Sequence, residues 1–407
     1  MLIGIDASRA FIKNRTGIEE YSFQVIKNLM NKLDGHQVVL YVKRSQKSQA
    51  ESQKLPENWR VKVIKWPHLW TQIGLSLELL FHPVDVLFVP AHTVPLVHPK
   101  NTVVTIHGLE YEFCPKAYSL LERIYMRFSI KNSCKWAKKI IAVSENTRND
   151  LIKLYGVLSE KIEVVYEGYD SNFEFRISNF ESNSNFQNSN LKIESKFKIQ
   201  NSKFLLFVGR LEERKNICGI VEAFKILKEK YKIPHKLVLA GKSGFNYGIA
   251  KLKIENCKLK IIELGFVSEE EKYELLKNAE VFLFPSFYEG FGLPILEAQS
   301  VGTPVVTSNI SSMPEITCHS ERLVKNPSIN NTDFSLNRSG SFIAATQDDR
   351  CSAMLVDPNK PEEIAEATWK LISDEKLKND LVNRGFENTK RFSWEKCGEE
   401  IAELLKN

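Results

Sequence analysis

The chain has 407 residues, more than a single hydrophobic core usually serves, so we expect two domains. Its composition, 43% apolar and 26% charged, is that of an ordinary globular protein, and no apolar run approaches the roughly 18 residues of a membrane-spanning helix. The net charge of +6 lies within residues 1–170, which indicates either an anionic partner for that half or a chance surplus. No nucleic-acid-binding pattern accompanies this charge, so a nucleic-acid partner is not expected.

Short β-branched runs alternate with helical stretches along the whole chain. The N-terminal run is expected to be a strand rather than a signal peptide. Helices are expected at residues 18–33, 216–231 and 269–277. The expected strands are LIGIDAS, HQVVLYV, VKVIKW, VDVLFVP, TVVTIHG and KIIAVSE in the first half, then FLLFVGR, KLVLAG, KIIELGFV, VFLFPS, PVVTSN and AMLVDP in the second. Apolar strands alternating with amphipathic helices predict an α/β protein with two doubly wound, Rossmann-like parallel sheets.

Polar, low-complexity segments mark the predicted domain boundaries. The expected divisions are an N-terminal domain at residues 1–175, a linker insertion at 176–203, a C-terminal domain at 204–390 with a polar insertion at about 318–349, and a closing helix at 391–407. Doubly wound sheets bind ligands at the carboxyl ends of their strands, so two of them in tandem predict a site in the cleft between the domains.

Cysteine, histidine and aspartate spacing argues against a metal site. The seven cysteines are scattered without a Cys-x-x-Cys pair, which predicts reduced thiols in a cytoplasmic protein. The eight histidines have no zinc-like spacing, and no Asp-x-Asp pair occurs. We therefore expect neither a metal nor a cofactor.

The stretch FPSFYEGFGLPILEA, residues 284–298, carries two carboxylates around a glycine-rich loop. The strand ends near Pro285 and Pro294 suits the first turn of a helix, so we expect Glu289 on the loop and Glu297 in the first helical turn. Backbone N–H groups at such a helix start bind anions, and the carboxylates would accept hydrogen bonds from sugar or ribose hydroxyls. The N–H groups in question belong to Gly290, Phe291, Gly292 and Leu293.

Two cations follow another buried strand in FLLFVGRLEERKN. Arg210 comes directly after the strand and Lys215 lies five residues further on, just before a helix. An Arg fork with a Lys point charge suits a diphosphate whose negative charge grows as a bond breaks. The alternative is that both are ordinary surface charges at the start of a helix.

The first half offers two further candidates. Gly17 lies between the first strand and its helix and is a single-glycine phosphate-loop candidate, with a simple tight turn as the alternative. His107 ends a buried strand, on the edge of the sheet where ligands are expected, with a purely structural histidine as the alternative.

A run of basic residues recurs at four-residue spacing: Arg123, Arg127, Lys131, Lys135 and Lys139. With the apolar residues between them they predict a basic amphipathic helix, which would suit an anionic membrane surface. The alternative is a solvated charged face whose apolar side lies in the core.

These motifs together resemble the family 4 retaining glycosyltransferases of GT-B fold, and the resemblance covers nearly the whole chain except the two insertions. Its most specific element is the pair of glutamates in EGFGLPILEA, with GRLEERKN upstream. The resemblance is to mannosyltransferase-like members that build surface polysaccharides. Two departures are Gly108, where many members follow the histidine with Asp, and VVYEGYD, where many read Asn-Gly-Val-Asp.

The resemblance implies roles for the residues above. Glu289 would hold hydroxyls of the donor sugar and Glu297 the ribose, while Arg210 and Lys215 would bind the diphosphate and stabilise it as it leaves. The backbone of Phe291 to Leu293 would contact phosphate and sugar, Gly17 would approach the donor, and His107 would lie near the donor sugar. It also implies a nucleotide diphosphate sugar as donor, weighted to GDP-mannose, transfer with retention, and a glycan or lipid-linked glycan as acceptor.

Three other functions use parts of the same pattern. A glycoside hydrolase would use Glu289 and Glu297 as acid and base, but it would leave Arg210 and Lys215 without a task. A nucleotide-sugar epimerase shares the two-domain architecture, and a non-catalytic binding protein could keep every motif.

Overall fold

The computed structural model describes residues 1–13, 15–169, 202–244, 247–256, 259–319 and 351–406. The chain divides into two compact units, each described by itself. Unit 1 comprises Met1–Leu109, Leu120–Gly168 and Phe392–Asn407, and unit 2 comprises Glu110–Ser119 and Tyr169–Arg391. Most of the predicted linker and of the predicted polar insertion, residues 176–201 and 320–349, lies outside the described residues.

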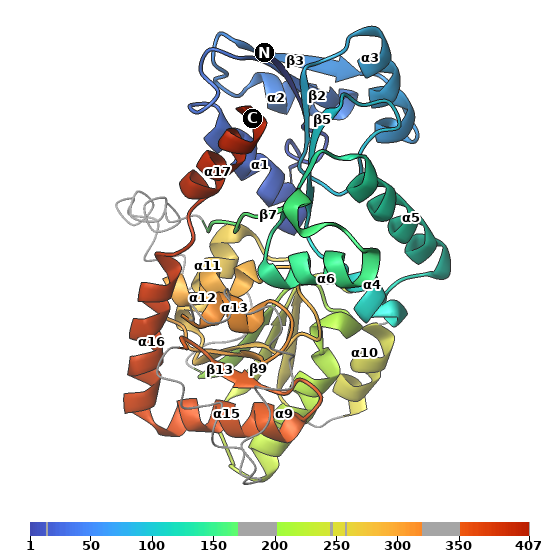
Figure 1. The fold of residues 1–407 in the computed structure, drawn as a ribbon. Helices are drawn as coiled ribbons and strands as arrows, with labels where there is room; N and C mark the ends of the chain where they lie inside the picture. The colour runs from blue at the N-terminus through green and yellow to red at the C-terminus, as the bar shows by residue number, and fades with distance from the viewer. Residues whose placement is uncertain (14, 170–201, 245–246, 257–258, 320–350, 407) are drawn as a thin grey trace. The chain divides into compact units, whose positions relative to one another are not determined.

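Unit 1 is built on a seven-stranded parallel sheet of order β3-β2-β1-β4-β5-β6-β7. Its strands are β1 (Leu2–Asp6), β2 (Gln37–Lys43), β3 (Trp59–Ile64), β4 (Val86–Val89), β5 (Asn101–Ile106), β6 (Lys139–Ala142) and β7 (Ile162–Val164). Its helices, shown around the sheet in Figure 1, are α1 (Gly17–Leu29), η1 (Arg44–Gln46), α2 (Lys47–Glu51), η2 (Trp70–Leu75), α3 (Ser76–Phe81), α5 (Leu120–Trp136), α6 (Glu145–Tyr155), η4 (Ser159–Lys161) and α17 (Trp394–Lys406).

Unit 2 is built on a six-stranded parallel sheet of order β10-β9-β8-β11-β12-β13. Its strands are β8 (Phe204–Val208), β9 (Lys236–Ala240), β10 (Ile261–Gly265), β11 (Val281–Phe284), β12 (Val305–Ser308) and β13 (Met354–Val356). Its helices are α4 (Glu110–Phe113), η3 (Pro115–Ala117), η5 (Glu213–Lys215), α9 (Ile217–Glu229), α10 (Tyr247–Asn256), α11 (Glu269–Asn278), α12 (Leu293–Ser300), α13 (Met313–Thr317), α15 (Pro361–Ser373) and α16 (Glu375–Thr389).

The strand predictions are confirmed, with one omission. All twelve predicted runs contain a strand, but β7 was not predicted, since this three-residue strand has one buried and two half-buried side chains instead of a fully apolar run. The predicted helix at residues 18–33 ends earlier, at Leu29, and the predicted helix at residues 269–277 is α11, which opens with a capping box formed by Ser268 and Glu271.

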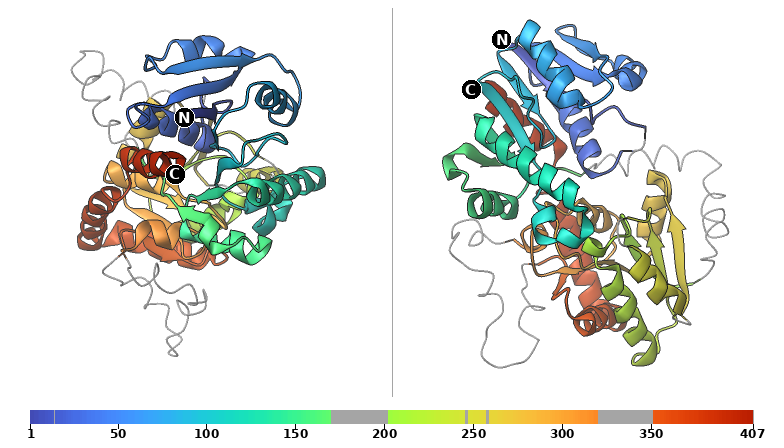
Figure 2. Two further views of the ribbon diagram at one scale, coloured as in Figure 1. Left: turned by 45° about the horizontal axis from the view of Figure 1, so that its top comes forward. Right: turned by 90° about the vertical axis from the view of Figure 1, so that its right-hand side faces the viewer.

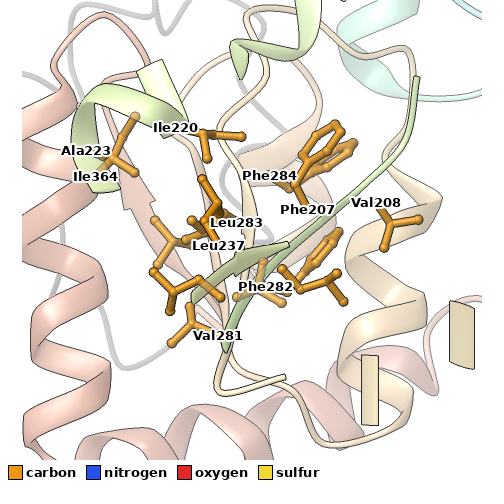
Figure 3. Close-up of a cluster of buried hydrophobic side chains, with 14 of the residues drawn as sticks. Phe207, Val208, Ile220, Ala223, Leu237, Val281, Phe282, Leu283, Phe284 and Ile364 are labelled. Carbon is orange, nitrogen blue, oxygen red and sulfur yellow. The ribbon is translucent and has the colours of Figure 1, made fainter. Parts of the chain in front are cut away.

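The central strands of unit 2 lie within its hydrophobic core. Strands β8 and β11 are neighbours, and every residue of both is buried. Phe207 and Phe284 stack with ring centroids 6.2 Å apart among the apolar side chains drawn in Figure 3. The order of strands reverses between β8 and β11, which makes their carboxyl ends the switch point at which doubly wound sheets bind ligands.

The prediction of reduced thiols is wrong for two cysteines. Cys318 and Cys351 form a disulfide, because an antiparallel β-bridge brings their Cα atoms to 4.0 Å although they are 33 residues apart in sequence. Four further cysteines in the described residues are unpaired: Cys114, Cys134, Cys218 and Cys397. Cys257 lies outside the described residues.

Within the part of the chain that the structure describes, no helix is both long enough and apolar enough to cross a membrane.

Candidate functional site

The candidate site lies where the connections after β8 and β11 meet in unit 2. The backbone N–H of Phe287, after β11, donates to the carbonyl of Arg214, after β8, at 2.9 Å. This contact joins the 3-10 turn η5, which carries Lys215, to the loop that carries Glu289. The structure therefore brings together two of the predicted residues that lie 74 positions apart in sequence.

Glu289 is a buried carboxylate held between two cations. Its Oε1 accepts a hydrogen bond from Lys215 Nζ at 2.5 Å, and its Oε2 accepts one from Arg214 Nη1 at 2.9 Å. The side chains of Lys215 and Glu289 are each only 10% exposed. Burial alone would raise the pKa of Glu289, but Lys215 and then Arg214 outweigh it and lower that pKa from its usual 4.5 to about 2.

The two cations differ in how firmly they hold their protons. Burial lowers the pKa of Lys215 more than Glu289 raises it. Burial acts on Arg214 in the same direction, but Glu289 and Glu212 outweigh it and raise the pKa of Arg214 well above its usual value. Of the two, Arg214 holds its charge more firmly.

The loop after β11 is fixed by two serines that follow β12. The Ser311 hydroxyl accepts from the Glu289 N–H at 3.1 Å and donates to the Glu289 carbonyl at 2.7 Å. The Ser312 hydroxyl bonds the carbonyls of Glu289 and Phe291. These contacts set the backbone of Glu289 independently of its side chain.

Helix α12 begins beside this loop. Gly292 is its N-cap, with a φ of 129° that favours glycine, and Leu293 and Pro294 open its first turn. The predicted helix N-terminus is thus present next to the Lys215–Glu289 pair. Phe291 is buried beneath it.

Glu297 does not lie where the sequence predicts, and Arg210 follows β8 as predicted but is not one of the cations that contact Glu289. Glu297 is the fifth residue of α12, so it lies in the second helical turn rather than the first, because the helix begins only at Leu293. Its Oε1 accepts from Lys272 Nζ at 2.8 Å. Arg210 is 69% exposed and its Nε lies 3.9 Å from Glu212 Oε2, so the residue paired with Lys215 around Glu289 is Arg214.

In unit 1, His107 follows β5 and is nearly buried. Its Nδ1 lies 3.2 Å from Glu167 Oε1, and its Nε2 lies 2.8 Å from the Pro90 carbonyl oxygen. These two contacts hold the ring from both sides and fix its orientation. Glu167, from the VVYEGYD stretch, supplies a carboxylate for His107 where Gly108 has none.

Gly17 is the first residue of α1 in unit 1. A Cβ atom built on it would meet nothing within 4 Å, so packing within the unit does not require glycine there. The residue before it, Thr16, has an extended backbone and its side chain does not cap the helix.

Sequence reasoning missed Arg214, Glu212, the two serines and Glu167. Arg214 stands beside Lys215 in ERKN, but its partner Glu289 is 75 residues away, so no local pattern distinguishes it from Arg210. The non-consensus glutamate in VVYEGYD was a usable signal for Glu167, because it coincides with the missing Asp after His107.

The sequence matches two family models. The model "Glycosyltransferase Family 4" matches residues 15–173, and "Glycosyl transferases group 1" matches residues 189–338. O-antigen chain mannosyltransferase B of Escherichia coli is 29% identical over 301 residues, which are 73% of this chain and 68% of that protein. O-antigen chain mannosyltransferase RfbU of Salmonella typhimurium is 26% identical over 258 residues, which are 63% of this chain and 65% of that one.

Solved structures share the fold at low identity. The structure of HepE from Anabaena in complex with UDP and glucose superposes with a TM-score of 0.68 and 17% identity, covering 100% of this chain and 99% of that one. WaaG, a glycosyltransferase involved in lipopolysaccharide biosynthesis, superposes with a TM-score of 0.65 and 14% identity, covering 100% of both chains. With two family models matching successive parts of the sequence and two parallel Rossmann-like sheets in the fold, the chain belongs to the family 4 glycosyltransferases and has the GT-B fold.

Proposed function

We propose that the protein transfers a hexose from a nucleotide diphosphate sugar, with GDP-mannose preferred, to a glycan or lipid-linked glycan acceptor with retention at the anomeric carbon. The observation that carries the proposal is the buried Lys215–Glu289 pair at the switch point of the second sheet, beside the N-terminus of α12. Relatives named as O-antigen mannosyltransferases support the sugar, and a fold relative solved with UDP-glucose supports the class of donor.

In this proposal, each residue of the site has its own role. Glu289 accepts hydrogen bonds from donor-sugar hydroxyls, Glu297 from the ribose, and Lys215 neutralises the diphosphate. Arg210, being exposed, can turn to the same diphosphate, and the backbone from Gly290 to Leu293 contacts the phosphate and the sugar. Transfer breaks the bond from the anomeric carbon to the diphosphate oxygen and forms one to the acceptor oxygen on the same face. The acceptor's proton passes to the departing diphosphate.

Gly17 and His107 of unit 1 also take part in the proposed reaction, which needs no metal. Gly17 lets the donor approach the backbone, and His107, held in place by Glu167 and the Pro90 carbonyl, lies near the sugar. No metal or other cofactor is required in this proposal, since Lys215 and Arg210 supply the positive charge for the diphosphate. Unchanged turnover after exhaustive chelation is the expected result, and loss of turnover restored by a divalent cation would contradict it.

Donor binding is the first test. In a thermal-shift screen, GDP-mannose at 100 times its Kd is expected to stabilise the protein by about 2.7 kcal/mol, raising the Tm by several degrees. UDP- and ADP-sugars at the same concentration are expected to give smaller shifts. A clear shift with UDP-sugars and none with GDP-mannose would overturn the choice of donor.

Turnover separates the transferase from its rivals. A new glycosidic product is expected only when donor and acceptor are both present. Conversion of the donor without acceptor would assign an epimerase, sugar release from an oligosaccharide without nucleotide a hydrolase, and binding without turnover a non-catalytic protein.

Helix α5 of unit 1 exposes apolar side chains instead of burying them. Leu121 and Phe128 are 80% and 68% exposed, and Ile124 lies on the same helical face, followed by the exposed Lys131 and Lys135. The alternative in which the apolar side of this helix lies in the core is therefore wrong. The residues of α5 that face the core are Ser129, Ile130, Ser133 and Cys134.

The apolar surface continues beyond α5. The loop of residues 93–98 is tied to α5 by the Val94 N–H, which donates to the Ser133 hydroxyl, and to α3 by the Val97 N–H, which donates to the Ser76 hydroxyl. Figure 1 places α3 and α5 on the same side of unit 1, which the right-hand view of Figure 2 turns toward the viewer. Exposed large apolar residues of this surface, besides those of α5, are Leu77, Leu80, Phe81 and Leu96.

We propose that this surface lies on the cytoplasmic face of an anionic membrane, where a lipid-linked acceptor would be found. Apolar side chains enter the interfacial region while flanking cations meet acidic headgroups. A location in the cytoplasm also fits the four unpaired cysteines. The Cys318–Cys351 disulfide is the feature that would then face a reducing environment.

Vesicle flotation tests the membrane proposal. Leu121→Gln with Phe128→Gln is expected to reduce binding to phosphatidylglycerol vesicles about tenfold or more, as is Arg127→Glu with Lys131→Glu. Ile249→Gln with Leu252→Gln, which removes two exposed apolar side chains of α10, is the matched control and should bind like wild type. Unchanged flotation of the α5 variants, or loss of self-association instead of vesicle binding, would contradict the proposal.

A further inference from the structure

Arg214 is the most constrained cation of the site. Its Nη1 donates to Glu289 Oε2 and to the Tyr288 carbonyl, both at 2.9 Å. Its Nε and Nη2 donate to Glu212 Oε1 at 3.1 and 2.8 Å. The guanidinium fork therefore spans the connection after β8 and the loop after β11, and none of these contacts requires a ligand.

Lys215 is held differently. Among the described residues its ammonium donates one hydrogen bond, to Glu289 Oε1, and lies 4.8 Å from the centroid of the Phe284 ring. Its four-carbon stem can rotate about several bonds, whereas the planar fork of Arg214 is fixed by three acceptor groups. Of the two cations on Glu289, Lys215 is the one that can be redirected.

We propose that Arg214 is a positioning residue that keeps Glu289 ionised and in place while Lys215 turns from Glu289 to the diphosphate of the donor. This rests on the proposed function, because it assumes a donor with a diphosphate. When Lys215 leaves, Glu289 Oε2 keeps its hydrogen bond to Arg214, so the buried carboxylate is never without a cation. Its free Oε1 then becomes the acceptor for a sugar hydroxyl.

The surroundings of Arg214 support a permanent charge there. The segment Glu110–Ser119 packs into unit 2 beside the site, with the Phe113 ring stacked on Tyr288 at a centroid distance of 4.6 Å. Among the described residues, the titratable groups that act on Glu289 or Arg214 are Lys215, Glu212, Glu110, Tyr118 and Cys114. Burial raises the pKa of Cys114 to about 11 and raises that of Tyr118 as well, so the negative charges that favour the protonated guanidinium, besides Glu289, are the carboxylates of Glu212 and Glu110.

The test compares Arg214→Gln with Arg214→Lys. In Arg214→Gln we expect kcat/KM to fall about 10- to 100-fold, and its decline on the acid side to move to higher pH, because Glu289 keeps only Lys215 as a cation. Arg214→Lys keeps the charge, so the acid limb should stay in place while part of the rate is recovered. Arg148→Gln is the matched control, because Arg148 also pairs with a glutamate, Glu145 at 3.1 Å, but in unit 1, and it should behave like wild type.

Two outcomes would overturn this inference. One is an Arg214→Gln enzyme whose rate falls without any movement of the acid limb, and the other is an Arg214→Lys enzyme with the pH profile of Arg214→Gln. Either would mean that Arg214 only supports the fold.

A readout independent of turnover separates this inference from the proposed function. The carboxyl ¹³C signal of Glu289, identified by its loss in Glu289→Gln, can be titrated in labelled protein without donor. We expect the Glu289 pKa to rise in Arg214→Gln and to stay near the wild-type value in Arg214→Lys. An unchanged Glu289 pKa in Arg214→Gln would refute the role of Arg214 even in a protein that transfers no sugar.

Discussion

Replacing Lys215 with alanine is expected to lower kcat for sugar transfer by about 100- to 1000-fold, a loss of about 3–4 kcal/mol of transition-state stabilisation. Negative charge grows on the diphosphate as it leaves, and the buried ammonium at the end of β8 is placed to neutralise it. Arg214 cannot take over, because its fork is already bound to Glu212, Glu289 and the Tyr288 carbonyl. The KM for donor should change less than kcat, since the interaction strengthens as the bond breaks.

Initial rates at saturating donor measure this effect. Lys253→Ala is the matched control, because Lys253 Nζ also pairs with a glutamate of unit 2, Glu222 at 2.8 Å, but on the surface, and its rate should equal that of wild type. A Lys215→Ala enzyme that keeps its rate within about threefold of wild type would show that the diphosphate is stabilised by other groups.

Lys215 and Glu289 could be predicted because the strands before them carry an unambiguous signal. Every residue of Phe204–Val208 and Val281–Phe284 is apolar and buried, and short connections follow both strands. Doubly wound topology then puts their carboxyl ends side by side at the switch point. For these two residues, strand pattern and fold class were enough.

Arg214 could not be chosen over Arg210 on the same grounds. The direction of a side chain in the connection between β8 and α9 depends on the local backbone, and Arg214 in η5 is buried whereas Arg210 before it is exposed. The carboxylate that decides between them lies 75 residues further along the chain. Such a contact is a property of the tertiary structure and leaves no local periodicity.

Long-range packing also explains the other surprises. The Cys318–Cys351 disulfide depends on a β-bridge between residues 33 positions apart, which cysteine spacing does not reveal. The segment Glu110–Ser119 follows a strand of unit 1 yet packs in unit 2, through contacts such as Phe113 on Tyr288. Hydrophobic patterning predicts neither feature, because it shows which face of an element is buried but not which other element packs against that face.

Replacing Glu289 with alanine is expected to lower the free energy of unfolding of unit 2 by about 3–5 kcal/mol. The change leaves Lys215 and Arg214 buried together without the carboxylate between them, although Arg214 keeps its ion pair with Glu212. Glu297→Ala is the matched control in the same motif. Its side chain is 28% exposed and pairs with Lys272, so it should cost about 1 kcal/mol or less.

Trp369 makes the measurement specific to unit 2, because it is the one tryptophan in the sequence of residues 110–119 and 169–391. Its ¹⁹F signal in 5-fluorotryptophan-labelled protein reports urea unfolding of this unit. Replacing the pair as Glu289→Met with Lys215→Met should recover part of the loss, because the Lys215 charge left unpaired by Glu289→Ala is removed with its desolvation cost. A Glu289→Ala protein no less stable than Glu297→Ala would mean that the cations do not depend on Glu289.

The difference in unfolding free energy between wild type and Glu289→Ala should depend on pH. The folded pKa of Glu289 is lowered from 4.5 to about 2, so its ionised form stabilises the fold fully above pH 4.5 and loses that effect as the pH falls toward 2. A shift of this size corresponds to about 3 kcal/mol, close to the loss expected from truncation. The stability difference between wild type and Glu289→Ala should therefore be largest near neutral pH and shrink on acidification. A difference that stays constant from pH 7 to 3 would instead point to lost packing, since van der Waals contacts do not titrate.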